Sequence, residues 1–130
     1  MIKHYYWPTP NGHKTAIMLE EVELESELYP INILAGDQFH PDFIAISPNH
    51  RIPTIIDLDG PQEAPYTVFE SGAILLYLAE KTGKLIPSDI AGRNETVQWL
   101  MFQMGDIGPM FARYRHFTTY ARENFDYFID

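Results

Sequence analysis

Residues 68–78 read VFESGAILLYL, a short apolar run that breaks at two polar residues before a helical pattern begins. The stretch predicts a strand that leads into the N-terminus of a helix. Ser71 suits the N-cap position, because its hydroxyl oxygen can accept a hydrogen bond from an amide of the first turn. The remaining amides and the helix dipole attract an anion, while the adjacent Glu70 carboxylate attracts a cation. This junction between strand and helix is therefore a candidate binding site for an α-amino-acid group.

The segments around this stretch predict a β-hairpin followed by the helix. Residues 51–58 read RIPTIIDL, and residues 66–69 return as the partner strand after a turn at residues 59–61. A proline at the start of a strand marks a fixed turn, in cis or trans geometry. The helix is expected over residues 71–82, with Gly83 at its C′ position.

The N-terminal part of the chain predicts a strand, a loop, a helix and a second strand. Residues 2–7 are rich in β-formers, and the two prolines within residues 8–12 prevent regular strand pairing there. Residues 14–24 have the apolar periodicity of an amphipathic helix, and residues 27–34 alternate as a strand does. Residues 38–46 predict a loop with a short helix.

The predicted order over the first 85 residues is strand, helix, strand, helix, strand, strand, helix. This order predicts an α/β domain with a mixed sheet, in which the first two strands are parallel and the last two form an antiparallel hairpin. A linker is expected over residues 84–89. We therefore expect an α/β domain at residues 1–85 and part of an all-α domain at residues 86–130.

The second part contains a helical pattern over residues 97–107, where apolar residues recur at intervals of three and four. Gly105, Gly108 and Pro109 predict a bend or an interruption in this helix. An all-α region of this length has few elements with which to close a core. We therefore expect it to be the first portion of a larger helical domain.

Composition argues against several classes of function. A formal net charge of −9 opposes nucleic acid or an anionic membrane surface as the main partner. The absence of cysteine excludes a thiol nucleophile on the protein, so sulfur chemistry needs a sulfur supplied by a ligand. The five histidines lack metal-site spacing, and we expect no metal. Without a signal-peptide pattern or an apolar run of about 18 residues, a cytoplasmic protein is expected.

Three motifs resemble those of the glutathione transferases. Residues 47–53, SPNHRIP, are similar to the family's loop before its cis-proline, and residues 69–80, FESGAILLYLAE, are similar to its strand-to-helix step. Residues 9–14, TPNGHK, resemble the signature of the bacterial nu-class enzymes and of their yeast relative, the nitrogen-regulatory prion protein. The resemblance covers residues 1–117. It implies a thioredoxin-like fold for residues 1–85 and a glutathione site shared by the three motifs.

The resemblance assigns a part of glutathione to each motif. Glu70 is expected to bind the γ-glutamyl ammonium, and Ser71, with its helix N-terminus, the γ-glutamyl carboxylate. Ile52, ahead of Pro53, is expected to pair through its backbone with the cysteinyl residue, as an added strand does. Two further residues are candidates for the glycyl end or the neighbouring carboxylate: Gln38 and Arg51.

Thr9 and Asn11 are the candidate catalytic residues. They occupy the loop in which thioredoxins and glutaredoxins keep their cysteines. In a chain without cysteine, their hydroxyl and amide groups can only stabilise the sulfur of a bound glutathione and lower its thiol pKa below about 8.5. Tyr5 and Tyr6 are the alternative, because other transferase classes use a tyrosine near the end of the first strand. Strand alternation directs one of these two into the core.

The resemblance implies a glutathione-dependent disulfide-bond reductase, or more broadly a glutathione transferase, in which bound glutathione supplies the thiolate. The implied ligand is reduced glutathione or glutathione disulfide, and the implied partners are a small disulfide or electrophile and a second copy of the chain. The alternative is a non-catalytic, transferase-like interaction module. Full-length family members carry further helices with basic residues near a second glutathione, and none of these maps onto this sequence.

Overall fold

The computed structural model describes residues 1–121 and 123. The chain divides into two compact units, Met1–Ile86 and Pro87–Asp130. The division falls one residue after the boundary expected from the sequence. The first unit is an α/β domain and the second, in its described part, is helical.

The first unit is built on a four-stranded mixed sheet with the order β2-β1-β3-β4. Its strands are β1, Ile2–Tyr6; β2, Ser26–Pro30; β3, Thr54–Asp57; and β4, Tyr66–Phe69. β1 pairs in parallel with β2 and antiparallel with β3, and β3 pairs antiparallel with β4. The parallel pair, the hairpin and the thioredoxin-like fold predicted from the sequence are confirmed.

Two of the strands are shorter than predicted. β2 ends at Pro30, and after the Ile31 amide donates to the Tyr6 carbonyl at 2.9 Å the backbone turns away from the sheet. The side chain of Asn32 stabilises that turn, since its Oδ1 accepts hydrogen bonds from the two amides that follow. β3 begins only at Thr54, because the preceding Pro53 has no N–H with which to pair.

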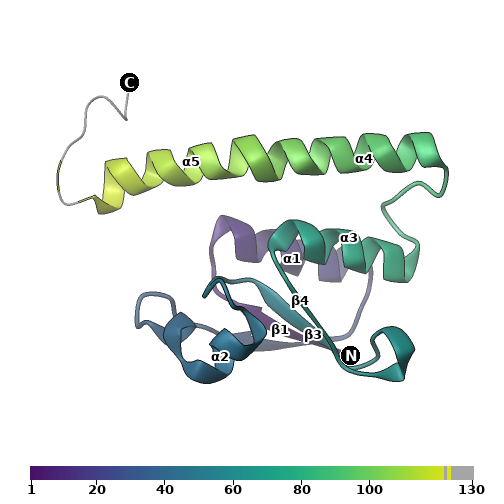
Figure 1. Ribbon diagram of the computed structural model, residues 1–130, viewed down its shortest axis with the longest axis horizontal. Helices are drawn as coiled ribbons and strands as arrows, with labels where there is room; N and C mark the ends of the chain where they lie inside the picture. The colour runs from purple at the N-terminus through teal and green to yellow at the C-terminus, as the bar shows by residue number, and fades with distance from the viewer. Residues whose placement is uncertain (122, 124–130) are drawn as a thin grey trace. The chain divides into compact units, whose positions relative to one another are not determined.

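Helices cover both faces of the sheet. Helices α1, Pro10–Glu21, and α3, Ser71–Thr82, lie side by side on one face, and the short α2, Pro41–Ile46, lies on the other (Figure 1). Two 3-10 turns, η1 at Asp37–Phe39 and η2 at Pro61–Glu63, precede α2 and β4. The buried apolar core contains Ile2, Met18, Leu19, Val22, Ile55, Ile74, Leu78 and Ala79.

α1 begins four residues before the predicted helix. Thr9 is its N-cap, because Thr9 Oγ1 accepts a hydrogen bond from the Gly12 amide at 3.2 Å. Pro10 follows in the first turn, where a helix does not need the missing N–H. Thr9 and Asn11 are therefore not in an open loop, as predicted, but at a helix N-terminus.

The second unit follows one continuous helical path. Its elements are α4, Ile90–Phe102; the π-helical turn η3, Gln103–Ile107; α5, Gly108–Arg115; and a second π-helical turn η4, His116–Tyr120. The regular α-helix is interrupted, as predicted, in the segment of Gly105, Gly108 and Pro109, where the π-helical turn η3 separates α4 from α5, but the chain stays helical. In η3 the Gly108 amide donates to the Gln103 carbonyl, five residues back, and this wider turn accommodates a proline without an amide.

The described residues of the second unit bury no side chain. Its largest exposed apolar side chains are Ile90, Trp99, Met101, Phe102, Ile107, Met110, Phe111, Tyr114 and Tyr120. Across residues 1–121 and 123, no helix combines the length and the hydrophobicity that a membrane crossing requires.

Candidate functional site

A small cavity of about 50 Å³ lies where three motifs of the first unit meet. It is bounded by the N-terminus of α1, the loop before β3 and the junction of β4 with α3. The lining residues are Asn11, Ser47, Arg51, Ile52, Pro53, Phe69, Glu70 and Ser71. Thus all of the predicted site residues except Thr9 and Gln38 line one cavity.

Glu70, and not Ser71, occupies the N-cap position of α3. Ser71 is the first residue of the helix and is buried, so the predicted cap was wrong by one residue. Glu70 has φ 70° and ψ 119°, a conformation that costs a residue with a side chain on the order of 1–3 kcal/mol. Its carboxylate makes no cap bond and instead accepts a hydrogen bond from Asn49 Nδ2 at 3.2 Å. The carboxylate is thereby held at the cavity wall rather than over its own helix.

Ser47 organises the loop that leads into β3. Its hydroxyl donates to the Arg51 carbonyl at 2.8 Å and accepts from the Arg51 amide at 3.4 Å. The Ile52–Pro53 peptide bond that follows is cis, and both residues are buried. Sequence reasoning assigned no role to Ser47 or to Asn49. Both are polar residues inside the SPNHRIP motif, which was the signal that could have identified them.

The N-terminus of α1 contributes Asn11 to the cavity, whereas Thr9 lies outside its lining. The Thr9 hydroxyl oxygen accepts a hydrogen bond from the Gly12 amide. The hydroxyl hydrogen can therefore still be donated to another acceptor. Lys14, one turn further along α1, is attracted electrostatically by the Glu70 carboxylate. Burial lowers the pKa of Lys14, and the Glu70 carboxylate partly opposes that decrease.

Neither tyrosine at the end of β1 lines this cavity. Tyr5 lies on the α2 side of the sheet, where it stacks on Tyr29 with ring centroids 5.0 Å apart. Burial, followed by the charge of Glu27, raises the pKa of Tyr5. The hydroxyl of Tyr6 is 3.1 Å from Nδ1 of His13. The geometry therefore favours Asn11 over either tyrosine as a group that reaches a ligand in the cavity.

Gln38, like Thr9, does not line the cavity. It lies in η1, and its Nε2 donates to the Ile33 carbonyl at 3.3 Å. Its Oε1 is buried, and the described part of the chain offers it no hydrogen-bond partner. One of the two hydrogens of the side-chain amide is thus committed to the Ile33 carbonyl.

The cavity combines three recognition chemistries. The Glu70 carboxylate suits a cation, the first amides of α3 suit an anion, and the backbone at Ile52 precedes a strand. Among the described residues, no cluster of three or more His, Asp or Glu side chains is placed to hold a metal ion. The arrangement fits a zwitterionic amino-acid group joined to an extended peptide.

Comparison with known proteins shows which family the chain is similar to. Residues 1–80 match the N-terminal domain of glutathione S-transferases. The chain is 47% identical over 133 residues to the disulfide-bond oxidoreductase YfcG of Escherichia coli (strain K12), a match that covers 100% of this chain and 61% of that protein.

Two solved structures are similar to this chain over nearly all of its length. One is a glutathione transferase family member from Pseudomonas fluorescens pf-5 with two glutathione bound; its TM-score is 0.95 and its identity 47%, over 98% of this chain and 57% of that one. The other is a glutathione transferase from Pseudomonas putida with one glutathione disulfide bound per subunit; its TM-score is 0.92 and its identity 49%, over 96% of this chain and 54% of that one. The chain thus spans only part of each relative's length. Because the N-terminal domain match extends over most of the chain, this protein belongs to the glutathione S-transferase family.

Proposed function

We propose that this chain carries the glutathione site of a nu-class, glutathione-dependent thiol-disulfide oxidoreductase. The observation that carries the proposal is that Asn11, Ile52 and Glu70, from three separate motifs, line a single cavity. Two similar proteins add support: YfcG is named a disulfide-bond oxidoreductase, and the Pseudomonas putida structure holds glutathione disulfide. The proposed substrates are small disulfides, and small electrophiles are the alternative substrate class.

In this proposal the γ-glutamyl end of glutathione enters the cavity. Its ammonium forms an ion pair with Glu70, and its carboxylate accepts hydrogen bonds from the first amides of α3, at Ser71. The cysteinyl residue follows and pairs with the backbone of Ile52, which lines the same cavity. Arg51, exposed beside it, is assigned the glycyl carboxylate. Gln38 is assigned the same carboxylate, through the amide hydrogen that is not donated to the Ile33 carbonyl.

The sulfur chemistry takes place at the N-terminus of α1. The Thr9 hydroxyl and the Asn11 amide donate to the glutathione sulfur and lower its thiol pKa, as does the helix dipole. The thiolate attacks one sulfur of the substrate disulfide, and the other sulfur leaves as a thiolate that takes a proton from water. A second glutathione thiolate attacks the mixed disulfide and releases the second thiol with glutathione disulfide. Two electrons pass from two glutathione molecules to the substrate.

Removal of either sulfur donor is expected to slow turnover roughly threefold, because the loss of thiolate is partly offset by the higher nucleophilicity of the more basic thiolate. A hydrogen bond to a charged acceptor is worth about 1.5 kcal/mol, so its loss in Thr9→Ala or Asn11→Ala raises the pKa of the bound thiol by about one unit. The measurement is reduction of the mixed disulfide between glutathione and 2-mercaptoethanol, corrected for the reaction of glutathione alone. The rate should recover in both variants as the pH is raised.

Thr9→Ser is the matched control, because serine keeps both the hydroxyl donor and the helix cap. It should retain most of the parent rate. A parent rate equal to the glutathione-only background, or alanine variants as fast as the parent, would reject the enzymatic proposal for this chain. Glutathione binding without turnover would instead favour the non-catalytic interaction module.

We also propose that the protein forms a homodimer. Apolar side chains are exposed on α4 and α5, among them Trp99, Met101 and Phe111, and water disfavours such exposure. Sedimentation velocity is expected to show association that increases with protein concentration, and aggregation at the upper end of the range. A monodisperse monomer at every concentration would contradict this prediction.

A further inference from the structure

Asn11 is followed by Gly12, and this is the one place in the sequence where glycine follows asparagine. Asparagine is a thermolabile residue. It is most labile before glycine, because glycine has no side chain to shield the backbone nitrogen that attacks the asparagine carboxamide. The pair lies in the first turn of α1, where Asn11 is exposed and Gly12 is buried. A chemically labile pair therefore includes the proposed sulfur donor.

The reaction of such a pair is a deamidation. The amide nitrogen of Gly12 attacks Cγ of Asn11, so that a bond forms between these two atoms and the Cγ–Nδ2 bond breaks. Ammonia leaves with the proton of the Gly12 amide, and water then opens the cyclic imide to an aspartate or an isoaspartate. The reaction needs no oxidant or reductant. Its product at position 11 is a carboxylate, which accepts hydrogen bonds but has no N–H to donate.

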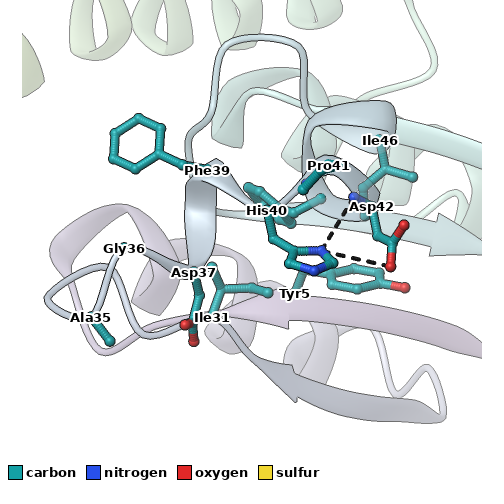
Figure 2. A pocket seen from close by; sticks show the side chains of 11 residues that line it. Tyr5, Ile31, Ala35, Gly36, Asp37, Phe39, His40, Pro41, Asp42 and Ile46 are labelled. Atoms are coloured by element: carbon teal, nitrogen blue, oxygen red, sulfur yellow. Dashed lines mark hydrogen bonds and ion pairs between the residues drawn. The ribbon is translucent and has the colours of Figure 1, made fainter.

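The fold requires glycine at position 12. A Cβ atom there would lie 2.2 Å from the Trp7 carbonyl oxygen and 3.0 Å from the Tyr6 ring, so α1 packs directly on the end of β1. Of the two tyrosines at this end, Tyr6 makes the contact, while Tyr5 points to the α2 side, where a second cavity of about 600 Å³ lies (Figure 2). A larger side chain that would shield the nitrogen is thus excluded, and only the conformation of the turn can protect Asn11.

The conformation of the first turn opposes deamidation in two ways. The Gly12 nitrogen must give up its proton to attack, and its N–H donates to Thr9 Oγ1 at 3.2 Å, a bond that has to break first. Asn11 lies within α1, and a helical ψ, about −42°, turns the following amide nitrogen away from the side-chain carbon. Both protections are lost when the turn opens, and helix ends open more readily than helix centres. The rate of deamidation therefore depends on how firmly the turn is capped.

We propose that the Asn11–Gly12 pair is a deamidation site and that the Thr9 cap protects it. Thr9 then has a second role beside its proposed donation to sulfur, because its hydroxyl keeps the first turn closed and the Gly12 nitrogen engaged. Opening of the turn exposes Asn11 to an irreversible loss of its amide. The consequence, loss of a sulfur donor, rests on the proposed function, whereas the modification itself does not.

The test follows Asn11 by peptide mapping and mass spectrometry while the full chain is incubated without glutathione at mildly alkaline pH. A synthetic peptide of residues 7–16, too short to hold a helix in water, gives the unprotected rate. Asn11 of the folded parent is expected to be modified at least about tenfold more slowly than in the peptide. Asn32, which precedes the β-branched Ile33, is the internal control and should remain unmodified.

Thr9→Ala should be modified about fivefold faster than the parent, the factor that corresponds to the typical free energy of an N-cap. Thr9→Ser keeps the hydroxyl and should be modified at the parent rate. Asp57→Asn is the control for a general loss of stability. It disrupts the buried ion pair with Lys81, and Asp57 pairs with Ile2 at the end of β1 remote from α1, so it should not accelerate modification at Asn11.

Two kinds of result would overturn the proposal. One is an equal rate in the folded parent and the peptide, or in Thr9→Ala and the parent. The other is an equal acceleration in Asp57→Asn and Thr9→Ala, because the reaction would then pass through unfolding of the whole first unit. Far-ultraviolet circular dichroism before incubation shows that each variant is folded. The readout is a mass, so these outcomes are decided even if the chain reduces no disulfide.

Discussion

Glu70→Gln is expected to weaken glutathione binding roughly 10- to 150-fold while the fold remains intact. A charge-assisted hydrogen bond is worth about 1.5–3 kcal/mol, and each 1.4 kcal/mol changes Kd about tenfold. Glutamine keeps the shape of the side chain and can still accept from Asn49 Nδ2. It loses the charge that pairs with the γ-glutamyl ammonium. The backbone strain at residue 70 is the same in both proteins, so thermal unfolding should change little.

Calorimetry with two ligands separates this role from a general loss of the site. The ligands are glutathione and its analogue in which a glutaryl group replaces γ-glutamyl and removes the amine. The parent should prefer glutathione, and Glu70→Gln should bind the two about equally. Glu21→Gln, on the exposed end of α1, is the control and should bind as the parent does. An unchanged affinity in Glu70→Gln, or equal losses for both ligands, would show that Glu70 does not hold the ammonium.

Asp57→Asn is expected to lower the free energy of unfolding by about 2–4 kcal/mol. Asp57 is fully buried at the end of β3, and its carboxylate accepts from the Tyr77 hydroxyl at 2.7 Å and the Lys81 ammonium at 2.8 Å. Its other oxygen accepts from the Asp59 amide at 2.9 Å. Removing one partner of a buried ion pair typically costs 3–5 kcal/mol, and the partial exposure of Lys81 moderates that cost. These contacts join the sheet to α3, so the loss affects the whole first unit.

Asp57 also predicts how stability depends on pH. Burial raises the pKa of its carboxyl, but hydrogen bonds from Lys81, Tyr77 and Asp59 outweigh burial, so the net shift is downward. A lowered folded-state pKa gives stability that is complete above the unfolded value, near 3.9, and is lost as the pH falls below it. Urea unfolding from neutral to acidic pH should therefore show a smaller acid loss in Asp57→Asn than in the parent.

Asp59→Asn is the matched control for this prediction. Asp59 also faces Lys81, at 3.7 Å, but its side chain is 82% exposed. An exposed pair contributes about 0–1 kcal/mol, so this variant should unfold nearly as the parent does. Equal losses in the two variants, or an unchanged acid dependence in Asp57→Asn, would show that the buried carboxylate does not stabilise the fold.

Local patterns in the sequence predicted most of the fold. The β-forming residues of β1, the helical pattern of α3 and the turn between β3 and β4 are properties of neighbouring residues, so they could be recognised without a structure. The exact ends of the helices and strands could not be recognised in this way. Serine is the usual N-cap, but the residue at the α3 cap is Glu70, in a strained conformation and hydrogen bonded to Asn49 from a distant loop. A contact across 21 residues has no local signature.

The sequence by itself determined the family resemblance, the order of the elements and the need for a sulfur supplied by a ligand, because these follow from residue identity and from spacing along the chain. Only the tertiary structure decided which residues share the cavity. It placed Asn11 beside Glu70, kept Gln38 outside, and turned Tyr5 to the α2 face, where a second cavity lies. The physical reason is that the distance in space between residues far apart in the sequence depends on how α1, α3 and α2 pack on the two faces of the sheet. That packing is the sum of many weak contacts between remote segments.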